Sequence, residues 1–277
     1  MLTFQPATGE EHARISSAAS ELRDYALTSA EFLAALLKDV PPDSQLTQAY
    51  SREGGGWAYD GAVLKLSGAQ DHLLAVSRLL ASGEFPRYAL HTLIRAPLEG
   101  AARAAWLLEP GISDSRRLAR GMTERLANLL EVQRLGHASH ARNRMNELTK
   151  AAMRRSVPPT KDKKGRLLGF GSELRPDATK LLGKLLPETS PTTNGLSLGE
   201  FAYRSLSGRS HSSLWALIYN AQPIGRPRPG VTLAAMTASL DEVFLLLTTA
   251  VRVHHMALDL LARATGGRLI AETPSFT

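Results

Sequence analysis

The sequence predicts an all-α protein folded as a single bundle of six to eight helices. Hydrophobic residues recur at helical spacing along most of the chain, and no stretch alternates with a period of two for long enough to indicate a strand. Proline and glycine pairs separate the apolar stretches, and no internal repeat is visible. We therefore expect residues 1–277 to form one all-α domain, with a basic loop and short helix inserted at about 150–186.

The first helix is expected over residues of about 10–38. Apolar residues such as Leu22 and Leu33 lie on one face of it. Pro41 and Pro42 end it, because proline lacks the backbone N–H and disfavours helix in the residue before it.

The same periodicity and the same stop signals place the later elements. Ser113 is a plausible N-cap for one of them. The expected helices span about 60–81, 84–109, 113–155 with a break near Gly136, 172–186, 198–220 with a break or cap near Gly208, and 231–264 before Gly266 and Gly267. The expected loops and connectors are 156–171, 187–195 and 223–230.

Composition excludes several classes of protein. The chain has no cysteine, so disulfides, thiolate metal sites and cysteine nucleophiles are excluded. The 25 arginines against 8 lysines are a bias typical of high-GC bacterial genomes. The N-terminus has neither the basic nor the apolar region of a signal peptide, and charged residues interrupt every long apolar stretch. We expect a cytoplasmic protein with no membrane segment.

The net charge of +7 is concentrated in one segment. Residues 150–184 hold ten basic and three acidic side chains, and the rest of the chain is balanced. Lys161, Lys163 and Lys164 could contact a polyanion, with an affinity that depends on salt. Two other interpretations stay open. The segment could be a solvated surface loop, or a lid over a pocket.

One candidate site is a row of ionisable residues on the helix of 84–109. His91, Arg95 and Glu99 follow at i, i+4 and i+8, which places them on one helical face. Pro97 lies among them and predicts a kink. The row could be an acid–base face in a pocket, or a ladder of ion pairs in which Arg95 binds Glu99.

A second candidate site lies in the segment 203–215. Arg204 and His211 are seven positions apart, about two helical turns, and share a face if the helix is continuous. If the helix breaks at Gly208, His211 could instead begin a new helix, whose N-terminus favours anions. Arginine binds phosphate and histidine transfers protons, so such a pair suffices for RNA cleavage without a metal. The alternative is a polar helix start whose hydroxyls cap the backbone.

The Arg204-x6-His211 spacing, late in an all-α bundle, resembles the R-x4-6-H motif of HEPN (higher eukaryotes and prokaryotes nucleotide-binding) domains. The runs YRSLSGRSH and HTLIRAPLEGAARAAWLL are also similar to uncharacterised actinobacterial helical proteins of that group. The resemblance implies a dimeric, metal-independent ribonuclease in which Arg204 and His211 are catalytic. Two positions depart from the pattern: Gly208 interrupts the spacer, and Tyr203 stands before Arg204, where active members often have a small polar residue.

Other cofactor chemistry has little support in the sequence. No H-E-x-x-H zinc motif, Walker A loop, strand-led G-x-G-x-x-G or G-x-S-x-G elbow is present, so we expect no metal and no bound cofactor. The favoured hypothesis is a HEPN-like protein that binds RNA, a nucleotide or another phosphorylated ligand. The alternatives are a small-molecule enzyme that uses the His91, Arg95 and Glu99 row inside the bundle, and a non-catalytic interaction module.

Overall fold

The computed structural model describes residues 9–83, 87–189, 193–211, 221–228, 231–236 and 239–267, together with Pro274 and Phe276. Helices dominate these residues, which confirms the predicted all-α class. The elements of the main bundle are α1 (Gly9–Lys38), α3 (Trp57–Ala81), α4 (Arg87–Leu107) and α10 (Leu240–Ala264).

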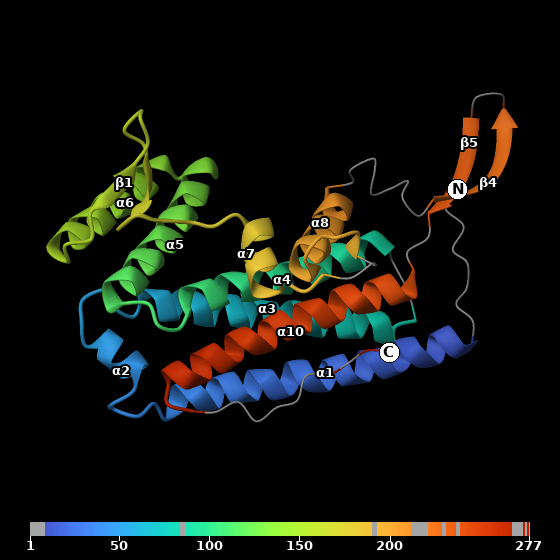
Figure 1. The fold of residues 1–277 in the computed structure, drawn as a ribbon, viewed down its shortest axis with the longest axis horizontal. Helices are drawn as coiled ribbons and strands as arrows, with labels where there is room; N and C mark the ends of the chain where they lie inside the picture. The colour runs from blue at the N-terminus through green and yellow to red at the C-terminus, as the bar shows by residue number, and fades with distance from the viewer. Residues whose placement is uncertain are drawn as a thin grey trace.

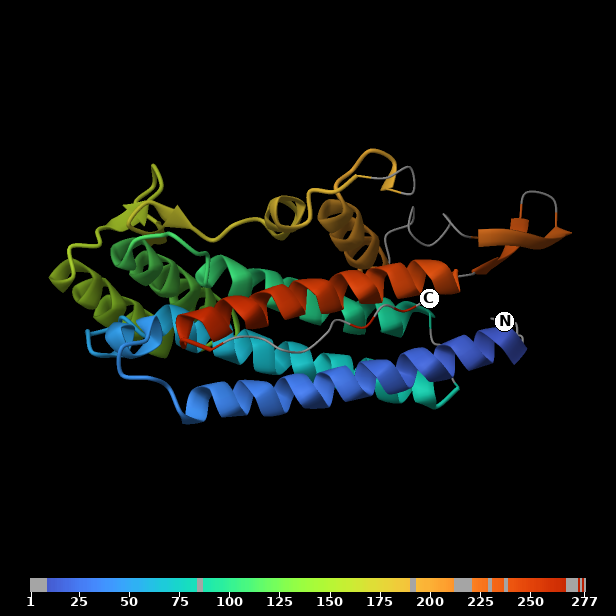
Figure 2. The ribbon, with the colours of Figure 1, turned by 60° about the horizontal axis from the view of Figure 1, so that its bottom comes forward.

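The four helices of the main bundle lie along one another and enclose the larger hydrophobic core (Figures 1 and 2). Leu22, Leu66, Leu98 and Leu258, one from each helix, are all fully or almost fully buried. The short helix α2 (Gln45–Tyr50) joins α1 to α3, and Ser44 caps it by accepting a hydrogen bond from the backbone N–H of Thr47.

A second, smaller core forms at one end of the bundle. It is built by α5 (Asp114–Arg134), α6 (Ala138–Arg154) and a small sheet. Ser113 caps α5 as the sequence predicts, and Gly136, with φ of +94°, separates the two helices. The prediction of one helical stretch broken near Gly136 is confirmed.

The prediction of a loop over 156–171 and of a helix starting near 172 is wrong. Three short antiparallel strands form the small sheet, with Pro159 opposite Phe170 and Gly169 opposite Leu174. Strands of two to four residues are too short to show an alternating pattern, so only their contact with α5 reveals them. The strands are β1 (Pro159–Lys161), β2 (Leu167–Phe170) and β3 (Glu173–Leu174).

The predicted last helix also starts later than expected. Residues 231–236 form β5 (Val231–Met236), which pairs with β4 (Ala221–Arg228) in a hairpin that projects from the bundle (Figure 1). The prolines of the predicted connector exclude helix there, and the β-branched residues that open β5 favour extended backbone. The helix α10 begins only at Leu240 and ends before Gly266, as the sequence predicts.

Two shorter helices cover the side of the bundle that faces away from α1: α7 (Ala178–Leu185) and α8 (Leu198–Ser210) (Figures 1 and 2). Asp177 caps α7, and Ser197 caps α8. The predicted helix over 198–220 therefore ends at Ser210, and its remainder, from 212 to 220, lies outside the described residues.

Within the described residues, α10 is the one helix whose length and composition would allow it to cross a membrane. In the structure, 61% of its most apolar stretch is buried against the rest of the protein. Its buried side chains belong to the larger hydrophobic core, so α10 occupies the place of a core helix.

Candidate functional site

The position of α8 depends on a close backbone contact with α7. Gly199, in the first turn of α8, lies against Leu182, and its N–H donates to the carbonyl oxygen of Leu186 at 3.2 Å. A Cβ at Gly199 would lie 2.0 Å from the Leu182 carbonyl oxygen. Only glycine allows the two backbones to approach so closely.

We expect Gly199→Ala to lower the free energy of unfolding by about 1–3 kcal/mol, because α8 must move away from α7. A matched control variant, Gly68→Ala, is expected to change the free energy of unfolding in the opposite direction. Gly68 is an exposed residue inside α3 with no atom near the added Cβ, so Gly68→Ala should raise stability by about 0.5–1 kcal/mol. Urea denaturation of both variants measures this, and equal effects would contradict the contact.

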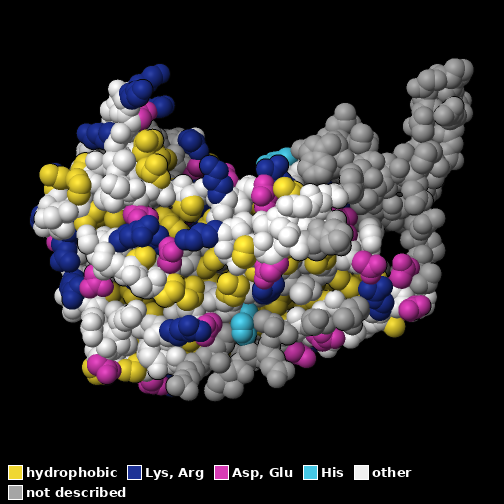
Figure 3. Space-filling model, viewed as in Figure 1, with side chains coloured by type: hydrophobic (Ala, Val, Ile, Leu, Met, Phe, Trp, Pro, Cys, Tyr) yellow, Lys and Arg dark blue, Asp and Glu magenta, His cyan; other side chains and the backbone are white. Residues whose placement is uncertain are grey.

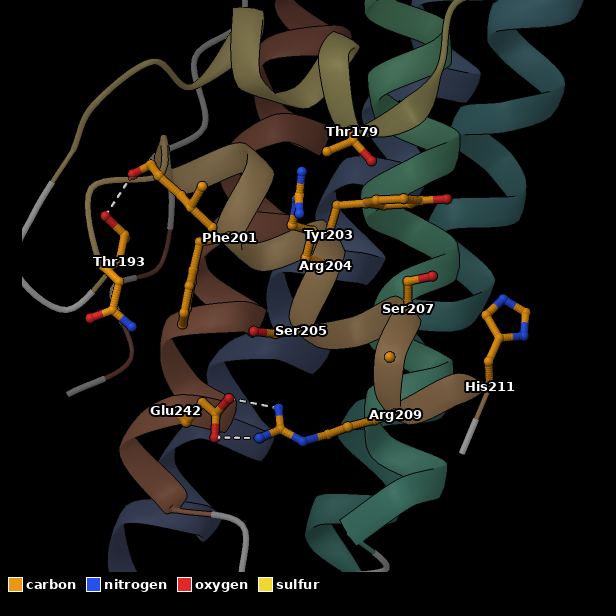
Figure 4. Close-up of a pocket in the computed structure, with 13 residues that line it drawn as sticks. Thr179, Thr193, Phe201, Tyr203, Arg204, Ser205, Ser207, Arg209, His211 and Glu242 are labelled. Carbon is orange, nitrogen blue, oxygen red and sulfur yellow. Dashed lines mark hydrogen bonds and ion pairs between the residues drawn. The ribbon is translucent and has the colours of Figure 1, made fainter. Parts of the chain in front are cut away.

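One face of α8 carries three polar side chains at intervals of four residues: Tyr203, Ser207 and His211. Figure 4 shows Tyr203 and His211 on the side where α4 passes. These side chains border an open pocket of about 510 Å³, whose other lining residues come from α7, α8, α10 and the loop before α8. They are Thr179, Thr193, Asn194, Leu196, Phe201, Arg204, Ser205, Gly208, Arg209 and Glu242.

Packing of α4 on α8 brings one member of each predicted site together. The Arg95 guanidinium lies 3.0 Å from Nε2 of His211, and its other terminal nitrogen donates to the Tyr203 hydroxyl at 3.3 Å. The guanidinium also lies over the Tyr203 ring, at 5.4 Å from its centroid. Arginine has no acceptor, so Arg95 donates and Nε2 of His211 accepts.

Arg204 lines the same pocket as His211 but has a different partner. It forms an ion pair with Glu200, one turn earlier on α8, at 2.7 Å. Its side chain is 59% exposed and therefore accessible to a ligand. His211 is the C-cap of α8, directly after Ser210, so no break separates it from Arg204. The chain that could form a new helix after His211 lies outside the described residues.

The row on α4 divides into a buried and a half-buried part. His91 is fully buried, so it does not line the pocket. Arg95 and Glu99 lie 3.7 Å apart, and Glu99 is closer to Arg103, at 2.9 Å. This arrangement matches the second interpretation of the row, a ladder of ion pairs. Arg95 lies at one end of the ladder and also contacts His211.

A buried ion pair between α8 and α10 forms part of the pocket lining. The sequence does not predict this pair. Arg209 of α8 binds Glu242 of α10 through two hydrogen bonds of 2.6 and 2.7 Å (Figure 4). Both side chains are largely buried, and such bidentate pairs fix geometry. Tyr203 and Ser207 lie in the predicted segment 203–215, but the prediction assigns them no role there, although the intervals of four residues that lead to His211 are visible in the sequence.

The three predicted lysines lie elsewhere. Lys161, Lys163 and Lys164 are exposed on the β1–β2 hairpin, which packs on α5 and does not line the pocket. The described chain contains no group of three or more histidine and carboxylate side chains placed to hold a metal ion. Comparison of the chain with protein-family models, curated proteins and solved structures gives no match.

Proposed function

We propose that this protein is a metal-independent ribonuclease whose site is formed by Arg95, Tyr203, Arg204 and His211. The observation that supports this most is the contact of 3.0 Å between the Arg95 guanidinium and the His211 imidazole at the edge of an open pocket. An imidazole can take a proton, and two arginines can hold a phosphate.

In the proposed reaction, the scissile phosphate binds Arg95 and Arg204. The phosphate competes for the Arg95 guanidinium, which exposes the lone pair on Nε2 of His211. Nε2 takes the proton of the ribose 2′-hydroxyl, the 2′-oxygen attacks phosphorus, and the bond from phosphorus to the 5′-oxygen breaks. A solvent proton neutralises the departing 5′-oxygen, and the product ends in a 2′,3′-cyclic phosphate. Tyr203 keeps Arg95 in place through its hydroxyl and ring.

The test is cleavage of a single-stranded oligoribonucleotide by the purified protein in EDTA. We expect His211→Ala to lower the cleavage rate by about 10²–10⁴-fold, because it removes the group that takes the proton. Arg95→Ala and Arg204→Ala should lower it by about 10²-fold or more, since each removes a phosphate contact. His140→Ala is the matched control, because His140 is an exposed histidine on α6.

Product analysis should find 2′,3′-cyclic phosphate ends, and DNA of the same sequence should stay intact because it lacks the 2′-hydroxyl. Absence of cleavage by the wild-type protein at every concentration tested would overturn the proposal. Equal cleavage by the wild type and His211→Ala would also overturn it, because the activity would then come from another site or from a contaminant.

A further inference from the structure

The β1–β2 hairpin carries positive charge that the protein does not neutralise. The ammonium groups of Lys161, Lys163 and Lys164 have no acidic partner among the residues that the structure describes. The nearby carboxylate of Asp162 is already engaged. It accepts the backbone N–H groups of Lys164 and Arg166 and pairs with the Arg166 guanidinium at 2.6 Å, which lowers the pKa of Asp162.

The hairpin is held firmly against α5, so its charges have a fixed place on the molecule. The hydroxyl of Thr123 accepts the N–H of Phe170 at 3.1 Å and donates to the carbonyl of Glu173 at 3.0 Å. Phe170 is fully buried in the smaller core. The Glu173 carboxylate pairs with the buried Arg120 at 2.9 Å. A preorganised basic surface loses less entropy on binding than a mobile one.

The chain runs from the hairpin directly to the pocket. Arg175 and Lys180 are exposed along this path, and Thr179 lines the pocket beside α8. The hairpin, α7 and α8 lie on the side of the bundle away from α1 in both ribbon views (Figures 1 and 2). In Figure 3, basic side chains cluster at the tip of the hairpin at the upper left, and others follow the upper edge toward the centre.

The hairpin is too far from His211 to bind the same phosphate. Arg95 and Trp106 are eleven residues apart on α4, which corresponds to about 16 Å. Arg120 binds both the Trp106 carbonyl and Glu173 of β3, the strand beside the hairpin, so the sheet packs at the Trp106 end of this stretch of α4 and His211 at the Arg95 end. At about 3.4 Å per stacked nucleotide, a strand needs at least about five nucleotides to cover this separation.

We propose that the β1–β2 hairpin is a second, remote binding site for single-stranded RNA, and that it contacts the backbone of a strand whose scissile phosphate lies beside His211. The contact uses Lys161, Lys163 and Lys164 as phosphate ligands and gives no base specificity. The position of the scissile phosphate beside His211 rests on the proposed ribonuclease function. The binding of RNA by the hairpin itself does not require cleavage.

The experiment measures binding of fluorescein-labelled oligouridylates of about 4 and about 20 nucleotides to the full chain carrying His211→Ala, so that the RNA stays intact. Addition of Lys161→Gln, Lys163→Gln and Lys164→Gln should weaken binding of the long strand at least about tenfold and leave binding of the short strand unchanged. The slope of log affinity against log salt should fall by about two for the long strand, since three phosphate contacts are lost.

The matched control removes three exposed basic residues elsewhere, Arg23, Lys38 and Arg78, by changing each to Gln. An equal loss in this control would overturn the proposal, because net charge alone would then explain the effect. An unchanged affinity for the long strand, or an equal loss for both lengths, would overturn it too. Length-dependent binding that needs the lysines, in a wild-type protein that cleaves no RNA, would support the hairpin site while rejecting the proposed ribonuclease.

Discussion

Replacement of Arg120 by alanine is expected to lower the free energy of unfolding by about 3–5 kcal/mol. The guanidinium is only 3% exposed and pairs with Glu109 at 2.6 Å and Glu173 at 2.9 Å. It also donates to the Trp106 carbonyl at 2.5 Å and lies over the indole ring, at 5.2 Å from its centroid. Its removal takes a charged donor from the Trp106 carbonyl, which keeps only the N–H of Glu109 at 3.4 Å. Glu109 is left with Lys184 and Glu173 with Arg116, and both of these cations are more exposed than Arg120.

Urea denaturation followed by circular dichroism measures this effect. Arg134→Ala is the matched control, because the Arg134 side chain is 73% exposed and pairs with the exposed Glu131. The control should change stability by about 0.5 kcal/mol or less. A loss below about 1 kcal/mol for Arg120→Ala would show that the junction between α4, α5 and the sheet does not depend on this side chain.

Acid is expected to destabilise the protein through His254. This histidine of α10 is fully buried, and its Nδ1 lies 2.8 Å from the hydroxyl of Tyr25 on α1. Burial lowers the pKa of His254 to about 4, against the opposing effect of the Leu66 carbonyl, and the neighbouring His255 adds to the lowering. Burial also lowers the pKa of His255 and raises the pKa of Tyr25.

The direction of the pH dependence follows from which state of the protein, folded or unfolded, binds the proton. An unfolded histidine has a pKa of about 6.5, so between about pH 6.5 and pH 4 the unfolded chain binds a proton that the folded chain does not. Stability is therefore fully present above pH 6.5 and declines as the pH falls toward 4. The difference between a pKa of about 6.5 in the unfolded chain and about 4 in the folded protein corresponds to about 3 kcal/mol of stability at most.

The measurement compares the free energy of unfolding of the wild type and His254→Gln at several pH values, because glutamine keeps an acceptor for Tyr25 but does not titrate. The stability of the wild type should fall more steeply than that of the variant between pH 6.5 and 4. His140→Gln, at an exposed position, should follow the wild type. Parallel curves for the wild type and His254→Gln would contradict a neutral, buried imidazole.

The sequence predicts the helices well where the apolar period is long and the stop signals are strong. The break at Gly136 and the cap at Ser113 are local properties, which one turn of backbone determines. The small sheet is different. Its strands are held by α5: the Thr123 hydroxyl donates to the Glu173 backbone carbonyl, and Arg120 pairs with the Glu173 carboxylate. These partners lie about fifty residues away in the chain.

The candidate site shows the same division. The spacing of Arg204 and His211 on one helix can be read from the sequence, and so can the row that contains Arg95. The contact of Arg95 with His211, which are 116 residues apart, cannot be predicted from either pattern. It needs α4 to pack on α8, which also packs against α7 at Gly199.

The net charge illustrates what each level determines. The sequence by itself determined an all-α bundle and placed the whole positive excess within residues 150–184, because helical period and charge are local properties of the chain. Only the tertiary structure decided which of those basic side chains form ion pairs and which remain free to bind a ligand. Arg154, Arg166, Arg175 and Lys184 pair with carboxylates, some of them distant in sequence, while the three lysines of the hairpin have no carboxylate partner among the described residues. Which side chains form ion pairs depends on which helices and strands pack together, and only the tertiary structure specifies that packing.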